Sequence, residues 1–113
     1  MAKRFRTFQE FWPYYLSEHS KRGTRVFHFV GTTLLWIFLV QAFRRSSFVY
    51  LAAGVIAGYG FAWAGHFLIE KNRPATFVYP LFSLLGDFKM YALILTRGIT
   101  RELQRIVPAE RVS

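Results

Sequence analysis

The chain has 113 residues, no cysteine and a formal net charge of +9, with 53% hydrophobic and 19% charged residues. This length allows one domain, and the lack of cysteine excludes disulfides, thiolate nucleophiles, zinc fingers and iron–sulfur clusters within this sequence. Six of the 15 lysines and arginines precede the first apolar segment, two separate it from the second, and seven follow. Because they form no basic module with a recognition motif, we expect no nucleic-acid partner.

Residues 7–19 are predicted to form an amphipathic helix at a membrane interface. Thr7 and Glu10 have the spacing of a capping box at its start, and Pro13 is expected to kink or restart the helix. Aromatic side chains recur at helical spacing on one face, and such a face suits the boundary between lipid and water. This face consists of Phe8, Phe11, Trp12, Tyr15 and His19.

Two long uncharged segments follow this helix. Residues 26–43 and 46–69 contain no Asp, Glu, Lys or Arg. At about 1.5 Å rise per residue, each can cross a hydrocarbon core of roughly 30 Å as a helix. The loop between them holds little more than Arg44 and Arg45, so the two spans, placed at 26–43 and 47–70, must run antiparallel.

The sequence also predicts how this hairpin packs and which way it faces. Small residues form a stripe along the second span and permit close approach of the first span in lipid. The basic residues outside the hairpin outnumber those in its loop, so the positive-inside rule places both termini in the cytoplasm. We therefore expect an integral membrane protein. The small stripe consists of Gly54, Gly58, Ala62 and Gly65.

The remaining chain holds a shorter apolar segment and a basic one. Residues 75–86 are too few to span a membrane and contain Pro80, so we expect a re-entrant or interfacial piece. Residues 87–106 are predicted to form an amphipathic helix along the membrane surface. The alternative is a third span over 75–96, which would move the C-terminus across the membrane. The basic positions of the amphipathic helix are Arg97, Arg101 and Arg105.

The predicted fold class is therefore an all-α membrane protein. It is an antiparallel transmembrane helical hairpin with an N-terminal interfacial helix and C-terminal re-entrant or interfacial helices, and residues 1–113 form a single membrane domain. The sequence is compatible with a monomer or an oligomer, with membrane lipids as its surroundings.

The three histidines of the chain meet at one face of this predicted hairpin. His28 begins the first span and His66 ends the second, so both lie at a similar depth, with His19 just before them. Ionisable groups at membrane depth are functional candidates. Neutral imidazole binds iron, zinc and copper, and histidines with a carboxylate are the donor set of non-haem Fe(II) oxygenases. Glu70 and Asp87 are the candidate carboxylates, and Glu70 is either a ligand or holds the tautomer of one.

Two other functions fit the same residues. His28 and His66 have the residue type of axial ligands in a bis-histidine haem protein, which would act in electron transfer. Alternatively, the hairpin is a non-catalytic, lipid-binding scaffold whose histidines contact lipid headgroups.

Five blocks of the sequence resemble a known family. They are Phe8–His19, Arg25–His28 with Gly31-Thr32, Gly58–His66, Glu70–Phe77 and Pro80–Asp87. The Glu-x-Asn-Arg-Pro-Ala stretch after a Gly-His is the most specific. The family, formerly a domain of unknown function, consists of small membrane proteins and includes the fungal 2-hydroxy-fatty-acid dioxygenase of the endoplasmic reticulum. The chain looks like a bacterial short-form member over nearly its full length.

This resemblance implies an Fe(II)-dependent dioxygenase located in the bacterial inner membrane. The fungal enzyme removes the carboxyl carbon of a 2-hydroxy fatty acid during breakdown of the phytosphingosine chain, and O2 is the co-substrate. Its essential histidines map onto His19, His28 and His66. A 2-hydroxy carboxylate can chelate iron and leave a position for O2, while polar side chains nearby bind the carboxylate. The candidates for that role are Arg25, Asn72 and Arg73.

Overall fold

The structure, a computed structural model, describes residues 5–106, and this part of the chain contains helices and no strands. The all-α prediction is confirmed over this range. Five α-helices are joined by short turns, with a π-helical segment (η1) and a 3-10 turn (η2) between the third and fourth. In order they are α1 (Phe8–Ser17), α2 (Arg22–Arg45), α3 (Phe48–Ala64), η1 (Gly65–Glu70), η2 (Ala75–Phe77), α4 (Pro80–Leu95) and α5 (Ile99–Ile106).

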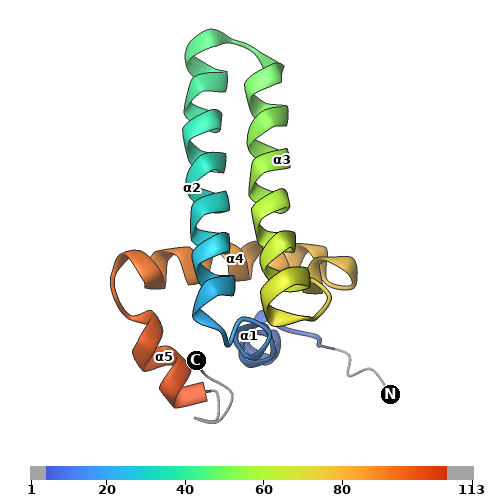
Figure 1. Cartoon of the computed structure of the whole chain (residues 1–113), viewed down its shortest axis with the longest axis vertical. Helices are drawn as coiled ribbons and strands as arrows, with labels where there is room; N and C mark the ends of the chain where they lie inside the picture. The colour runs from blue at the N-terminus through green and yellow to red at the C-terminus, as the bar shows by residue number, and fades with distance from the viewer. Residues whose placement is uncertain (1–4, 107–113) are drawn as a thin grey trace.

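Helices α2 and α3 form an antiparallel hairpin that stands on the other helices (Figure 1). Ser46 ends α2 with a left-handed backbone (φ 48°), and the Ser47 side chain caps α3 by accepting a hydrogen bond from the Val49 N–H. Helix α2 and the continuous segment Phe48–Glu70 are both long and apolar enough to cross a membrane. Because only 17% of each apolar window is buried, the hairpin presents most of its apolar side chains outward.

Glycines allow the two helices of the hairpin to approach closely. A Cβ atom added at Gly31 would lie 2.8 Å from the carbonyl oxygen of Gly58, and one added at Gly54 would lie 3.0 Å from Cβ of Phe38. Gly65 packs in the same way near the base, against Phe27. The predicted packing of the small stripe against the first span is confirmed.

An aromatic core lies below the hairpin, where α1 packs against α4 and α5. The aromatic face of α1 was expected to contact the membrane interface, but Phe11 and Tyr15 are 0% and 1% exposed and belong to this core. The reason is that α4 and α5 fold over the face. The Trp12 indole donates a 2.7 Å hydrogen bond to Glu102 of α5, and the Lys89 ammonium lies 4.4 Å from the centre of the Trp12 ring.

The start of α1 has half of the predicted capping box. The Thr7 hydroxyl accepts a hydrogen bond from the Glu10 N–H at 3.2 Å, whereas the Glu10 carboxylate accepts from the N–H of Arg6 rather than of Thr7. The helix continues through Pro13 to Ser17 and does not restart there.

The helix boundaries after residue 80 differ from the predicted ones. A single helix, α4, runs through the predicted division between 86 and 87, and the chain turns at 96–98, where Arg97 has φ 64°. Pro80 is accommodated at the first position of α4, where its missing N–H costs no helical hydrogen bond. Asp87 lies inside this helix, and its carboxylate accepts a hydrogen bond from a buried tyrosine, Tyr15.

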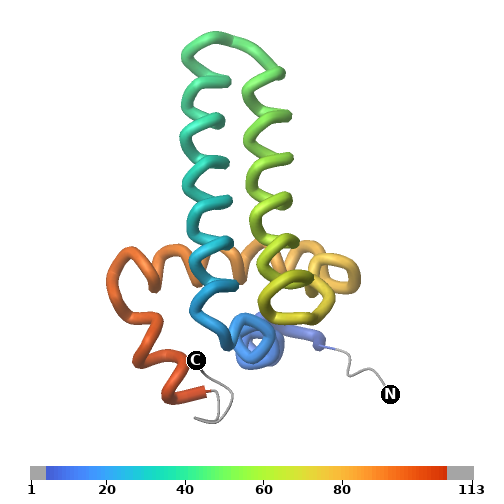
Figure 2. The backbone as a smooth tube through the Cα atoms, viewed as in Figure 1, coloured from blue at the N-terminus to red at the C-terminus, as the bar shows by residue number. Residues whose placement is uncertain are grey.

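Helix α4 also argues against the third span over 75–96. It has 16 residues, fewer than the roughly 20 that a transmembrane helix needs. It runs across the base of the hairpin rather than along it (Figure 1), and the chain reaches it from α3 through the loop after η1 (Figure 2).

The close contact of α2 and α3 gives a first prediction. We expect Gly31→Ala to lower the free energy of unfolding by about 1–3 kcal/mol, because its methyl group would push against the backbone of Gly58. Gly60→Ala is the matched control, since a Cβ there has no neighbour within 4 Å and alanine favours the helix. Unfolding in detergent micelles measures both, and equal stability of the two variants would contradict this interpretation.

Candidate metal centre

Three different elements bring the histidines together at the base of the hairpin. His19 lies in the turn after α1, His28 in the second turn of α2, and His66 in η1. They are 1%, 5% and 2% exposed. One ring nitrogen of each lies within 4.8 Å of the other two, and Nε2 of His19 is 3.2 Å from Nε2 of His28. The structure thus places the three predicted histidines in one cluster.

Hydrogen bonds fix the protons of two of these rings. Nδ1 of His19 donates to the carbonyl oxygen of Tyr15 at 2.7 Å, since a carbonyl can only accept. Nδ1 of His66 donates to Oδ1 of Asn72 at 2.7 Å, and the Asn72 amide is oriented by its own donation to the carbonyl of Glu18 at 3.1 Å. Both Nε2 atoms therefore carry lone pairs, as metal-binding imidazoles do.

A carboxylate and a tyrosine lie beside the histidines. Oδ1 of Asp87 accepts a hydrogen bond from the Tyr15 hydroxyl at 2.5 Å and lies 3.3 Å from Nε2 of His28. Burial, together with the nearby Asp87, raises the pKa of Tyr15 well above its usual value, so the phenol stays protonated and donates. The Tyr15 ring stacks on His19 with centroids 4.1 Å apart. This arrangement needs Gly86, because a Cβ there would lie 2.8 Å from the Tyr15 ring.

Glu70 lies outside the cluster of three histidines. Its carboxylate accepts hydrogen bonds from the hydroxyls of Ser20 and Thr24, both at 2.7 Å, and from the Lys21 N–H at 3.1 Å. A negative charge at the start of a helix satisfies free N–H groups and interacts favourably with the helix dipole. Glu70 thus binds the N-cap residue of α2, Lys21, and Asn72 holds the tautomer of His66.

The three residues expected to bind a substrate carboxylate do not line the cavity beside the histidines. The Arg25 guanidinium donates to the carbonyls of His19 and Ser20, both at 2.8 Å, and so fixes the turn that carries His19. Asn72 is engaged with His66, and Arg73 is exposed to solvent.

Among the residues that line this cavity but were not predicted as site residues are Trp63 and Ser83. Each had a signal in the sequence. Trp63 precedes His66 by three residues and Ser83 precedes Asp87 by four, spacings that place side chains on one face of a helix. Both were hard to recognise because neither residue type suggests a metal ligand.

The donor set fits a divalent transition metal. Burial, followed by the neighbouring His28 and His66, lowers the pKa of His19 well below its usual value, so its imidazole is neutral and able to bind a cation. Nitrogen donors bind such ions at about 2.0–2.1 Å, so a modest inward movement of the rings would suffice. The cavity beside the histidines has a volume of about 10 Å³, which is room for about one water molecule. The porphyrin of the haem alternative does not fit in this space.

Comparison with known proteins identifies one family. The family model described as 2-hydroxy-palmitic acid dioxygenase Mpo1-like matches residues 5–99, a stretch that contains all three histidines, Glu70 and Asp87. No curated protein and no solved structure matches the chain.

The neutral state of His19 predicts how stability depends on pH. The unfolded chain binds a proton at this residue near pH 6.5, whereas the folded protein binds it only at lower pH. Between these two pH values the unfolded state holds more protons, so a falling pH favours unfolding. We expect the unfolding temperature of the metal-free protein in detergent to fall as the pH drops from about 6.5 to 5. His19→Gln should weaken this dependence, and a flat profile for the wild type would contradict the prediction.

Proposed function

Because residues 5–99 match its model, the chain belongs to the Mpo1-like family, and we propose that it is an iron-dependent dioxygenase of 2-hydroxy fatty acids. The observation that carries the proposal is the cluster of three buried histidines, whose ring nitrogens lie within 4.8 Å of one another. The family's description names the reaction class and the type of substrate.

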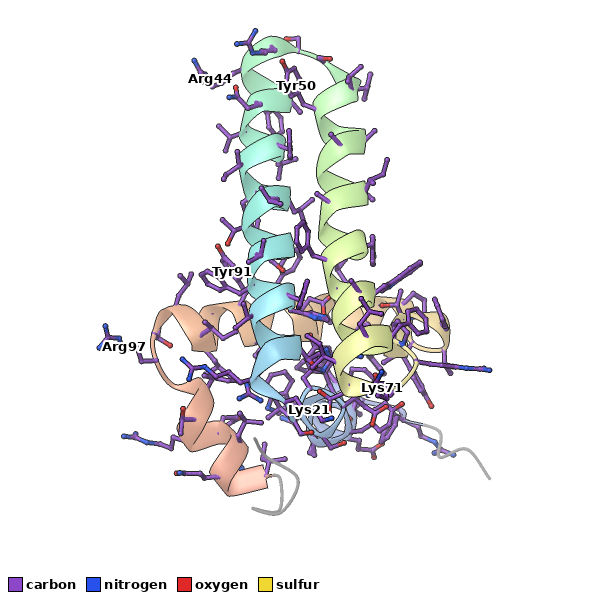
Figure 3. The ribbon with its side chains drawn as sticks, in the orientation of Figure 1. Lys21, Arg44, Tyr50, Lys71, Tyr91 and Arg97 are labelled. Carbon is purple, nitrogen blue, oxygen red and sulfur yellow. The ribbon has the colours of Figure 1, made fainter. Side chains whose placement is uncertain are left out.

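The exposed apolar hairpin supports a location in a membrane. Its outward side chains include Ile37 and Val40 of α2 and Ile56 of α3, which are 51%, 55% and 71% exposed. Soluble monomers rarely present so continuous an apolar surface. Basic residues lie at both ends of the hairpin, with Arg44 at the tip and Lys21 at the base (Figure 3). We place α2 and α3 across the membrane, α4 along its surface and both termini in the cytoplasm.

His19, His28 and His66 would hold the iron, leaving positions for other ligands. Bound iron would supply the activation of O2 that the side chains of this chain cannot provide. The protein's own contribution is orientation: the carbonyl of Tyr15 and the amide of Asn72 hold two imidazoles in the correct tautomer. Burial of the three rings keeps bulk water away from the centre.

The net reaction balances without a further co-reactant. A 2-hydroxy acid, R–CH(OH)–COOH, and O2 give R–COOH, CO2 and H2O. The bond between the carboxyl carbon and the hydroxylated carbon breaks, and the hydroxylated carbon becomes the new carboxyl group. The substrate loses four electrons in total, and O2 takes up all four.

Iron loading and product analysis test the proposed function. Wild-type protein, purified in detergent without oxygen and supplied with Fe(II), should bind one iron per chain and convert 2-hydroxyhexadecanoate with O2 into the acid one carbon shorter. His66→Gln should lose both properties, whereas Tyr50→Phe at the hairpin tip (Figure 3) should keep both. Iron-loaded wild-type protein that leaves this acid intact would refute the proposal.

The role of Asn72 gives a separate prediction about metal affinity. Asn72→Leu removes the acceptor for Nδ1 of His66 and should weaken Fe(II) binding about 10–100-fold, the usual cost of losing such a partner. Asn72→Asp keeps an acceptor and should retain most of the affinity. Competition with a chelator under anaerobic conditions measures both, and equal affinities of the Leu and Asp variants would show that this hydrogen bond does not matter.

A further inference from the structure

Two hydrogen-bonding groups beside the histidines have no partner. Among the described residues 5–106, the buried side-chain atoms without a hydrogen bond are Nδ1 of His28, Nε1 of Trp63 and Oγ of Ser83. Ser83 is 2% exposed, and both Trp63 and Ser83 line the small cavity that the three histidines also line. Buried donors without partners are rare in folded proteins and call for an explanation at each position.

The orientation of the Trp63 ring is held by its neighbours. The Trp63 ring packs edge-on against Phe77 and lies beside Tyr59, with centroids 5.2 and 5.7 Å apart. Ser83 lies on α4 one turn before Asp87, and both residues line the cavity. An indole N–H can only donate, and a hydroxyl can donate or accept. The cavity therefore offers at least one fixed donor, and a ligand oxygen would satisfy it.

An apolar groove of about 360 Å³ begins at the same place. It shares four lining residues with the cavity: His28, Tyr59, Ala62 and Asp87. From there it follows the hairpin to Leu35, a distance of about 10 Å at 1.5 Å per residue. The rest of its lining is apolar apart from one threonine: Thr32, Leu35, Val55, Gly58, Leu84 and Phe88. A space of this size and composition is typical of a site for a small apolar ligand.

We propose that the cavity and the groove form one substrate site, in which Trp63 and Ser83 bind one oxygen atom of the polar head, the size that the cavity admits, and the groove holds the first part of the acyl chain. This inference rests on the proposed function and deepens it. The polar head then lies between the metal-binding histidines and two uncharged donors, without an arginine. The acyl chain of the substrate leaves along the exposed face of the hairpin. The substrate therefore enters the site sideways from the lipid.

Binding measurements separate this proposal from the question of turnover. Anaerobic Fe(II)-loaded protein in detergent is titrated with 2-hydroxyhexadecanoate, for wild type, Ser83→Ala and Trp63→Phe. We expect unchanged iron content and about tenfold weaker binding in each variant, the usual effect of losing one hydrogen bond to a charged ligand. The matched controls are Ser17→Ala, whose hydroxyl donates to a backbone carbonyl outside the cavity, and Trp36→Phe, whose ring is tilted against Phe88 and lines neither the cavity nor the groove.

The groove is tested by a second pair of variants. Val55→Trp narrows the groove and should weaken binding of 2-hydroxyhexadecanoate more than of a short-chain 2-hydroxy acid. Ile56→Trp places the same ring on the outer face of α3 and should change neither.

The outcomes of these titrations are distinct. Iron-loaded Ser83→Ala and Trp63→Phe that bind as tightly as wild type would overturn the role of the donors, and equal effects of Val55→Trp and Ile56→Trp would overturn that of the groove. Wild-type protein that binds no 2-hydroxy acid would overturn the whole site. Protein that binds the acid through these residues but does not shorten it would uphold the site and refute the proposed reaction.

Discussion

The carboxylate of Glu70 ties the base of the hairpin to the start of α2, and the positions of all three histidines follow from this tie. The first residue that donates to this carboxylate, Ser20, directly follows His19, and the last, Thr24, lies one turn before His28. His66 lies in the same π-helical segment as Glu70. One half-buried carboxylate thus connects the turn after α1, the first turn of α2 and the end of the second apolar helix.

The protein is stabilised in two different ways along its length. At the base, aromatic side chains of α1 are enclosed by α4 and α5, as in a soluble core. Along the hairpin, glycine contacts bring two helices together while most apolar side chains face outward. The histidines lie where these two regions meet. A centre at this junction has rigid support on one side and an apolar, open surface on the other, which suits a ligand with a polar head and a long chain.

Sequence patterns identified the parts of this fold that depend on local rules. The uncharged segments predicted the two helices of the hairpin. The short loop at Arg44 and Arg45 predicted that these helices are antiparallel, which places His28 and His66 at a similar depth. The contacts that depend on the third dimension were missed. Asp87 pairs with Tyr15, a residue 72 positions earlier, and the α1 face is enclosed by helices far along the chain. The same holds for Asn72, whose role depends on a loop that no periodic pattern describes.

The π-helical segment η1 has a consequence for how this sequence can vary over evolution. His66 lines the cavity and Glu70 binds the start of α2, so the number of residues between them is fixed, whereas the identity of two of these residues is much less constrained. Phe67 and Leu68 are 47% and 67% exposed, so exchange for other apolar residues is tolerated. Loss of one residue there would shorten the segment and turn His66 relative to Glu70, so the two side chains could not both keep their partners. Related chains should therefore accept substitutions between these two positions but no insertion or deletion.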